Sequence, residues 1–149
     1  MLDHLSVEET QKNINKGQIS IKEVLVYYLD RIEKFNKDIN AIVLQKDREL
    51  LIKEAEQKDN LRSVNKILNG LPIAVKDLSD VVGLKTTYGY EGSKNNSPKK
   101  NSLFVDKLID EFRDKKTFSK NRRTFCSAST LKISLANFYL KKDKEYLGK

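Results

Sequence analysis

The charge of this chain changes abruptly near residue 112. Residues 1–111 contain 18 Lys and Arg against 18 Asp and Glu, whereas residues 112–149 contain 11 against 3, so this tail carries the whole formal excess of +8. The chain is 38% hydrophobic and 34% charged, against about 45–50% and 25% in typical globular domains. The sequence therefore predicts a small folded segment over 1–111 and a divergent basic tail over 112–149, either disordered or read out of frame.

Two capping boxes predict where the first helices begin. A serine followed three residues later by a glutamate occurs at Ser6 and again at Ser20, and in this arrangement each side chain satisfies a backbone amide of the first turn. Gly17 is a natural residue to end the first helix. The second helix is expected to span about residues 21–35, with an apolar face at helical spacing that comprises Val24, Tyr27, Tyr28, Ile32 and Phe35.

Short apolar runs alternate with helical patterns further along the chain. Residues 41–44, which follow a polar turn over 36–40, and residues 72–76 are each expected to form a strand. Asp47 is expected to open a helix. Ser102 is expected to cap a later helix, whose apolar face comprises Leu103, Phe104, Leu108, Ile109 and Phe112. Strands that alternate with helices indicate an α/β fold.

The second of these strands ends at Lys76, after a continuous apolar run. An ammonium group in apolar surroundings must be paired, must reach water or must lose its proton, and the last outcome would make it a base. Period-two alternation places Ile73 and Val75 on one face, with Ala74 and Lys76 on the other. Alternatively, Lys76 pairs with Asp77 or another acid and merely ends the strand. Spacing alone favours this ordinary ion pair, because paired lysines far outnumber catalytic ones.

The segment around this lysine resembles a known family. Residues 70–89 read GLPIAVKDLSDVVGLKTTYG. This resembles the region around the catalytic lysine of the amidase signature family, which shows G-[LIV]-P-[IV]-x-[VI]-K-D followed by G-x-x-T-T-x-G. Segments within residues 5–43 resemble the amino-terminal helices and first strand of the same family, in the same order. The resemblance covers roughly residues 5–111.

This resemblance implies both a fold and a chemistry. The fold would be the N-terminal helices and first strands of an amidase-like mixed α/β sheet, incomplete. Family enzymes cleave carboxamide C–N bonds with a Ser–cis-Ser–Lys triad, in which the lysine acts as base through the bridging serine. By motif match Lys76 would be this catalytic lysine. The wall of the substrate-binding cleft would contain Thr86, Thr87, Tyr88 and Gly89, although a hydroxyl-rich turn is an equally good interpretation of these four residues.

The chain departs from the family in one respect that affects its activity. Both catalytic serines of the family lie in a glycine- and serine-rich segment downstream of the lysine, whereas the six glycines of this chain are all isolated. Ser127, Ser129 and Ser134 have no neighbouring glycine that would tolerate a strained serine turn. We therefore expect a truncated remnant that is inactive alone, although its full-length relatives would hydrolyse a small amide.

Two other functions remain open at this point. The A subunit of a tRNA-dependent amidotransferase shares the same region, but KDLSD followed by TTYG resembles the stand-alone amidases more closely. A different class is a protein that binds nucleic acid or an anionic surface through the basic tail, which interleaves phenylalanines with cations: Lys115, Lys116, Phe118, Lys120, Arg122, Arg123 and Phe125. No recognised motif frames these residues, so a solvated tail is preferred and nucleic acid is not the expected partner.

Composition excludes several chemistries. Cys126 is the lone cysteine and His4 the lone histidine, which leaves no disulfide, no protein-only zinc site and no histidine-based triad. No glycine-rich loop is present to hold phosphates, so neither a cofactor nor a metal is expected. The first residues lack the apolar core of a signal peptide, and no window approaches the roughly 18 apolar residues of a membrane span. The expected location is the cytoplasm, with no membrane partner.

Overall fold

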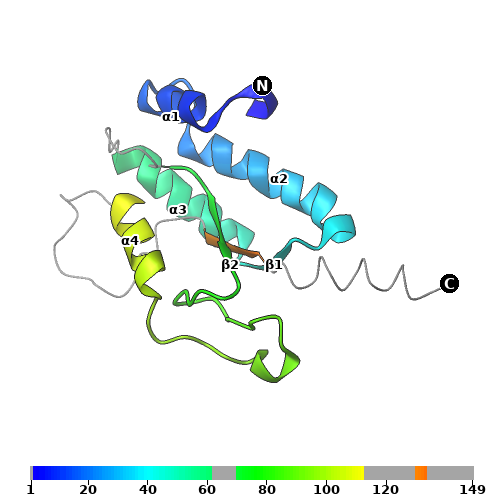
Figure 1. The fold of residues 1–149 in the computed structure, drawn as a ribbon. Helices are drawn as coiled ribbons and strands as arrows, with labels where there is room; N and C mark the ends of the chain where they lie inside the picture. Colours follow the sequence, from blue (N-terminus) through cyan, green and yellow to red (C-terminus); the bar gives the residue numbers. More distant parts are fainter. Residues whose placement is uncertain (1, 62–69, 113–129, 134–149) are drawn as a thin grey trace.

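The fold alternates helices with short strands. A computed structural model describes residues 2–61, 70–112 and 130–133 (Figure 1). Its elements, in chain order, are the 3-10 helix η1 (Leu2–His4), α1 (Val7–Asn15), α2 (Ile21–Ile39), β1 (Ile42–Gln45), α3 (Arg48–Leu61), β2 (Ile73–Lys76), the 3-10 helix η2 (Glu91–Ser93), α4 (Leu103–Phe112) and β3 (Thr130–Ile133). The predicted α/β class is confirmed.

The three strands form one mixed sheet in the order β1-β3-β2. β3 pairs in parallel with β2, where Ile73 lies opposite Thr130 and Lys76 opposite Ile133, and it pairs antiparallel with β1. Because α4 separates two parallel strands in the chain, β2, α4 and β3 form a βαβ crossover. The middle strand comes from within the basic segment 112–149, for which no strand was predicted. The division of the chain at residue 112 stays a prediction.

The first turn of α2 satisfies all of its amides with side chains, and the predicted capping box is confirmed. The Ser20 N–H donates to the Glu23 carboxylate at 2.8 Å, and the Glu23 N–H donates to the Ser20 hydroxyl at 3.0 Å. The pKa of Glu23 lies below its ordinary value, because the Ser20 backbone N–H and then its hydroxyl bind the charged form. The backbone amides of the two residues between Ser20 and Glu23 donate to the Asp59 carboxylate of α3. The distance is 2.7 Å from the Ile21 nitrogen and 3.1 Å from the Lys22 nitrogen.

Replacing Asp59 by alanine is expected to lower the free energy of unfolding by about 1–2 kcal/mol, because two amides of the α2 first turn lose their acceptor. Asp59→Asn keeps one acceptor oxygen and should lose roughly half as much. Urea unfolding followed by circular dichroism measures both variants. Equal stability of Asp59→Ala and the natural chain would show that the cap contributes nothing.

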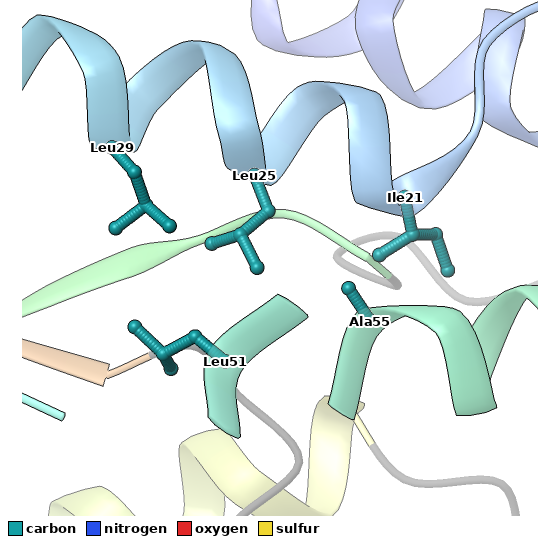
Figure 2. Close-up of a cluster of buried hydrophobic side chains, with 5 residues drawn as sticks. All are labelled: Ile21, Leu25, Leu29, Leu51 and Ala55. Carbon is teal, nitrogen blue, oxygen red and sulfur yellow. The ribbon is translucent and has the colours of Figure 1, made fainter. Parts of the chain in front are cut away.

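α2 packs on α3 through an aliphatic stripe. Ile21, Leu25 and Leu29 project from one face of α2 toward Leu51 and Ala55 of α3, and all five side chains are buried (Figure 2). The four-residue spacing within each set places the side chains on a single face of each helix. Burial of these side chains holds the two helices together, at about 25 cal/mol for each square ångström of apolar surface removed from water.

The apolar face predicted for α2 was partly wrong. Val24 is buried as expected, but Tyr28 and Phe35 lie exposed, and Arg31 stacks over the Phe35 ring at 5.4 Å. Tyr28 and Phe35 lie seven residues apart on one face of α2. α3 packs instead against the aliphatic stripe that ends at Leu29, the residue after Tyr28. Aromatic rings carry polar edges and stack with cations, which makes exposure tolerable for them.

The predicted turn over residues 36–40 was also wrong, since α2 continues to Ile39 and only Asn40 leaves the helix, at a φ of 51°. Asparagine tolerates this left-handed conformation better than most residues. Asn36 lies within the helix, and its side chain binds the backbone of Ile42. Its amide nitrogen donates to the Ile42 carbonyl and its oxygen accepts from the Ile42 N–H, both at 2.8 Å. This pair fixes the start of β1.

A second apolar cluster joins β2 to α4. It contains Val75, Val81, Leu84, Val105 and Ile109. The apolar face predicted for α4 was therefore wrong at two positions, because Leu103 and Phe104 are exposed while Val105, which the prediction omitted, is buried. The predicted cap was wrong as well. The Ser102 hydroxyl is buried without a hydrogen-bond partner among the described residues, so it caps no amide of α4. The Asp106 N–H donates to the backbone carbonyl of Ser102 and not to its side chain.

Candidate functional site

Lys76 is the last residue of β2, and its side chain lies on the exposed face of the strand. Val75 is 3% exposed and packs in the second cluster, whereas Ala74 and Lys76 are exposed. The predicted alternation along this strand is confirmed. Of the three outcomes open to the ammonium group, the structure shows that it reaches water. Within the described part of the chain its nitrogen forms neither an ion pair nor a hydrogen bond.

Asp77 fastens the end of β2 to a later turn. Asp77 is 2% exposed, and its carboxylate accepts from the Thr87 N–H at 3.0 and 3.1 Å and from the Thr87 hydroxyl. Its carbonyl accepts from the Tyr88 N–H at 3.2 Å. The interpretation in which Lys76 pairs with Asp77 is therefore wrong, because this carboxylate is turned toward Thr87. Asp77 instead orients the loop that follows the strand.

Residues 87–90 form a tight turn beside this anchor. The Tyr90 N–H donates to the Thr87 carbonyl at 2.9 Å, and the two central residues have positive φ, 56° at Tyr88 and 69° at Gly89. Two positive φ angles in the centre are typical of a type I′ turn. Glycine adopts this conformation without strain, whereas a tyrosine there is uncommon. The turn presents the Tyr88 side chain to solvent.

The four residues predicted for the substrate-binding wall thus differ in what they can contact. Thr86 is buried, and its backbone exchanges hydrogen bonds with Asn96, from the Thr86 N–H to the Asn96 carbonyl at 3.0 Å and from the Asn96 side chain to the Thr86 carbonyl at 3.1 Å. Thr87 is engaged by Asp77. Only Tyr88 and Gly89 are exposed. The role of Asn96 was missed, because nothing in a polar loop indicates which of its asparagines closes on a distant backbone.

Among the residues that the structure describes, no group of three or more His, Cys, Asp or Glu side chains could hold a metal ion. No helix in the described ranges is long and apolar enough to cross a membrane. The serines considered as nucleophiles, Ser127, Ser129 and Ser134, lie outside the described residues, as do the cations of the basic tail between 115 and 125. The described site therefore offers a solvent-exposed amine beside an anchored turn.

The comparisons with known proteins identify the class to which this fold and lysine belong. The sequence model of the amidase family matches residues 23–111, which include β2, Lys76 and the anchored turn. The chain belongs to the amidase family, and the resemblance expected from its motifs is confirmed.

Individual relatives agree with this assignment. The chain is 32% identical over 110 residues to an acylamidase of Rhodococcus erythropolis, which covers 72% of this chain and 23% of that protein. It is 28% identical over 108 residues to the A subunit of the glutamyl-tRNA(Gln) amidotransferase of Thermoanaerobacter pseudethanolicus, over 72% of this chain and 22% of that one. The structure is similar to that of an amidase family protein from Bacillus anthracis, with a TM-score of 0.69 and 25% identity over 89% of this chain and 24% of that one. The chain thus spans about a quarter of the length of these relatives.

Proposed function

We propose that this chain supplies the lysine-bearing part of an amide hydrolase, with Lys76 as the proton acceptor. The substrate would be a small carboxamide or aryl amide. In this role Lys76, once deprotonated, takes the hydroxyl proton of a nucleophilic serine through a bridging serine, while the serine oxygen attacks the amide carbonyl. The amine leaves with the proton, and water then hydrolyses the acyl-serine ester.

The exposed position of Lys76 at the end of β2 is the observation that carries this proposal. A base must approach its proton donor to within hydrogen-bonding distance, and Lys76 has neither a partner within the described residues nor a buried side chain. Asp77, the next residue, holds the turn with exposed Tyr88 and Gly89 at the same end of the strand. Lys76 and this turn would then form adjacent parts of one substrate site, with Tyr88 contacting the substrate.

The 149-residue chain alone is expected to show no amide turnover, because a base without its nucleophile leaves only residual effects. In subtilisin, loss of the nucleophile lowers kcat by on the order of 10⁶-fold. The assay would follow ammonia release from a simple carboxamide and aniline release from an aryl amide. Lys76→Ala should match the natural chain at background. Turnover by the natural chain that Lys76→Ala abolishes would overturn the expectation that this polypeptide lacks its nucleophile.

A second candidate is a part of the A subunit of an amidotransferase. Proteins of this name match with 28% identity over 72% of the chain, close to the match with the acylamidase. In either case the lysine would have the same role, and the two functions would differ in the amide that is cleaved. The stand-alone hydrolase is preferred, on the sequence around Asp77 and Thr87. The cytoplasmic location and the absence of a nucleic-acid partner stay predictions.

A further inference from the structure

One face of α2 has a heptad pattern that continues beyond the part of the helix that α3 covers. Apolar residues follow one another in alternating steps of four and three, which is the spacing of the contact seam in a coiled coil. They are Ile21, Leu25, Tyr28, Ile32, Phe35 and Ile39. α3 begins only at Arg48, whose guanidinium binds Asp30 at 2.6 Å and Glu33 at 2.8 Å. The pattern therefore extends along α2 past the start of α3.

The last four residues of this pattern are accessible. Tyr28, Phe35 and Ile39 are exposed to 39%, 40% and 47%, and Ile32 is half-buried. The first two residues of the pattern, by contrast, are buried and point toward α3 (Figure 2). Single exposed apolar residues need no explanation, whereas a row of them along one helix face indicates an interaction site. We call Tyr28, Ile32, Phe35 and Ile39 the α2 seam.

The α2 seam is complementary to itself when two copies of the helix meet antiparallel. With a two-fold axis midway along the seam, Tyr28 lies opposite Ile39 of the second copy, and Ile32 lies opposite Phe35 of the second copy. The symmetry repeats both contacts, because in a two-fold pair each residue meets the same partner in both directions. All four positions are covered in this register, and each layer combines one aromatic and one aliphatic side chain.

Two charged residues beside the seam match in the same register. Arg31 and Asp38 each precede an isoleucine of the seam directly, which is a position where interhelical salt bridges set the orientation of a coiled coil. In the antiparallel pair Arg31 lies opposite Asp38 of the second copy. A parallel pair would place it opposite Asn36 instead, with no opposite charge. Arg31 also binds Asp3 through Nη1 at 2.9 Å, and its guanidinium has further N–H donors for a second carboxylate.

We propose that two copies of this chain pair through an antiparallel contact between their α2 seams. The apolar register and the matching charges both point to a second copy as the occupant of this face. The contact is small beside the interfaces of permanent dimers, so its Kd should be on the order of 10 μM. The inference is independent of the role proposed for Lys76, which lies on β2.

Sedimentation equilibrium of the full chain, from well below to well above this concentration, measures the Kd. Phe35→Glu should weaken the dimer at least about tenfold, because it introduces a charge where an aromatic ring is buried on pairing. Phe104→Glu is the matched control: it is the same substitution on α4, where Phe104 is exposed to 59%, and it should change the Kd less than about twofold. Circular dichroism at low concentration checks that both variants keep the helix content of the natural chain.

Oxidative cross-linking tests the register. Cys126→Ser removes the lone cysteine, and Tyr28→Cys and Ile39→Cys are then introduced into separate chains. A mixture of the two variants should form a covalent dimer, since positions 28 and 39 lie opposite each other. Neither variant should link to itself, because like positions would be about 16 Å apart along the helices and a disulfide requires Cα atoms within about 7 Å. A parallel pair would give the reverse pattern.

A charge exchange tests the orientation independently. Asp38→Arg should weaken the dimer about threefold or more, because it sets two guanidinium groups against each other at each end of the contact. Adding Arg31→Glu to the same chain should return the Kd to within about twofold of the natural value, since opposite charges then face each other again.

Four results would overturn the proposal. The full chain could stay monomeric at every concentration, which would show that a different protein covers the seam, or the two glutamate variants could weaken the dimer equally. Cross-linking of each single cysteine variant to itself would contradict the antiparallel register. Pairing that requires deletion of residues 134–149 would show that this segment covers the seam in place of a second copy.

Discussion

Replacing Gly70 by alanine is expected to lower the free energy of unfolding by about 2–5 kcal/mol. Gly70 has a φ of +81°, and a Cβ atom there would lie 2.5 Å from Cγ1 and 2.9 Å from Cδ1 of Ile21. The left-handed conformation costs a residue other than glycine about 1–2 kcal/mol, and overpacking a core adds about 1–3 kcal/mol. Ile21 cannot move away freely, because it is buried against α3 at the start of α2.

Gly17→Ala and Gly83→Ala separate the two contributions. Both glycines have positive φ, +70° and +89°, but neither has an atom within 4 Å of an added Cβ. The free energy of unfolding of these two variants should fall only by the cost of the left-handed conformation, about 1–2 kcal/mol. Urea unfolding measures all three variants. The double variant Gly70→Ala, Ile21→Ala should lose less free energy of unfolding than the sum of the two single losses, because the two substitutions share one contact. Equal losses at all three glycines would contradict the proposed clash.

The features predictable from the sequence are those fixed by residues a few positions apart. The capping boxes at Ser6 and Ser20 were correct because both partners of each box lie within one turn of helix. Gly17 ends the first helix in the left-handed conformation for the same local reason. The alternation that exposes Lys76 follows from strand geometry alone.

Features that depend on distant segments could not be predicted in the same way. Which stripe of α2 is buried was decided by α3, and an aliphatic stripe and an aromatic stripe have the same period. Asp59 caps α2 from 38 residues away, and no pattern in either helix marks the pair. The strand at Thr130–Ile133 lies in the segment predicted to be a divergent basic tail, and it is defined by its pairing with β1 and β2.

The candidate site shows the same division. The motif predicted Lys76 and residues 86–89 as site residues, but it could not distinguish a threonine that contacts substrate from one that supports the loop. The structure separates them by their contacts. Thr86 is buried and its backbone is held by Asn96, Thr87 is held by Asp77, and Tyr88 is exposed.

Asp77→Ala is expected to lower the free energy of unfolding by about 2–4 kcal/mol. The structure should be loosened most near the candidate site. The carboxylate accepts from both the N–H and the hydroxyl of Thr87. Removing it leaves these two donors without this acceptor in a partly buried place, and hydrogen bonds to charged groups contribute about 1.5–3 kcal/mol each, less than additively when they share one acceptor. Asp77→Asn keeps the shape and one acceptor oxygen, so it should lose roughly half as much.

Hydrogen exchange resolves where the Asp77 substitution acts. The amides of Thr87 and Tyr90 should exchange faster in Asp77→Ala, while those of α2 around Leu25 should keep their rates, because α2 packs in a separate cluster. Thr87→Val is the matched control, since it removes only the hydroxyl bond and should lose about 1 kcal/mol. Unchanged exchange at residue 87 in Asp77→Ala would contradict the anchoring role. In that case the end of β2 would not hold the turn in place, and Lys76 and Tyr88 would have no fixed relation from which a substrate site could be built.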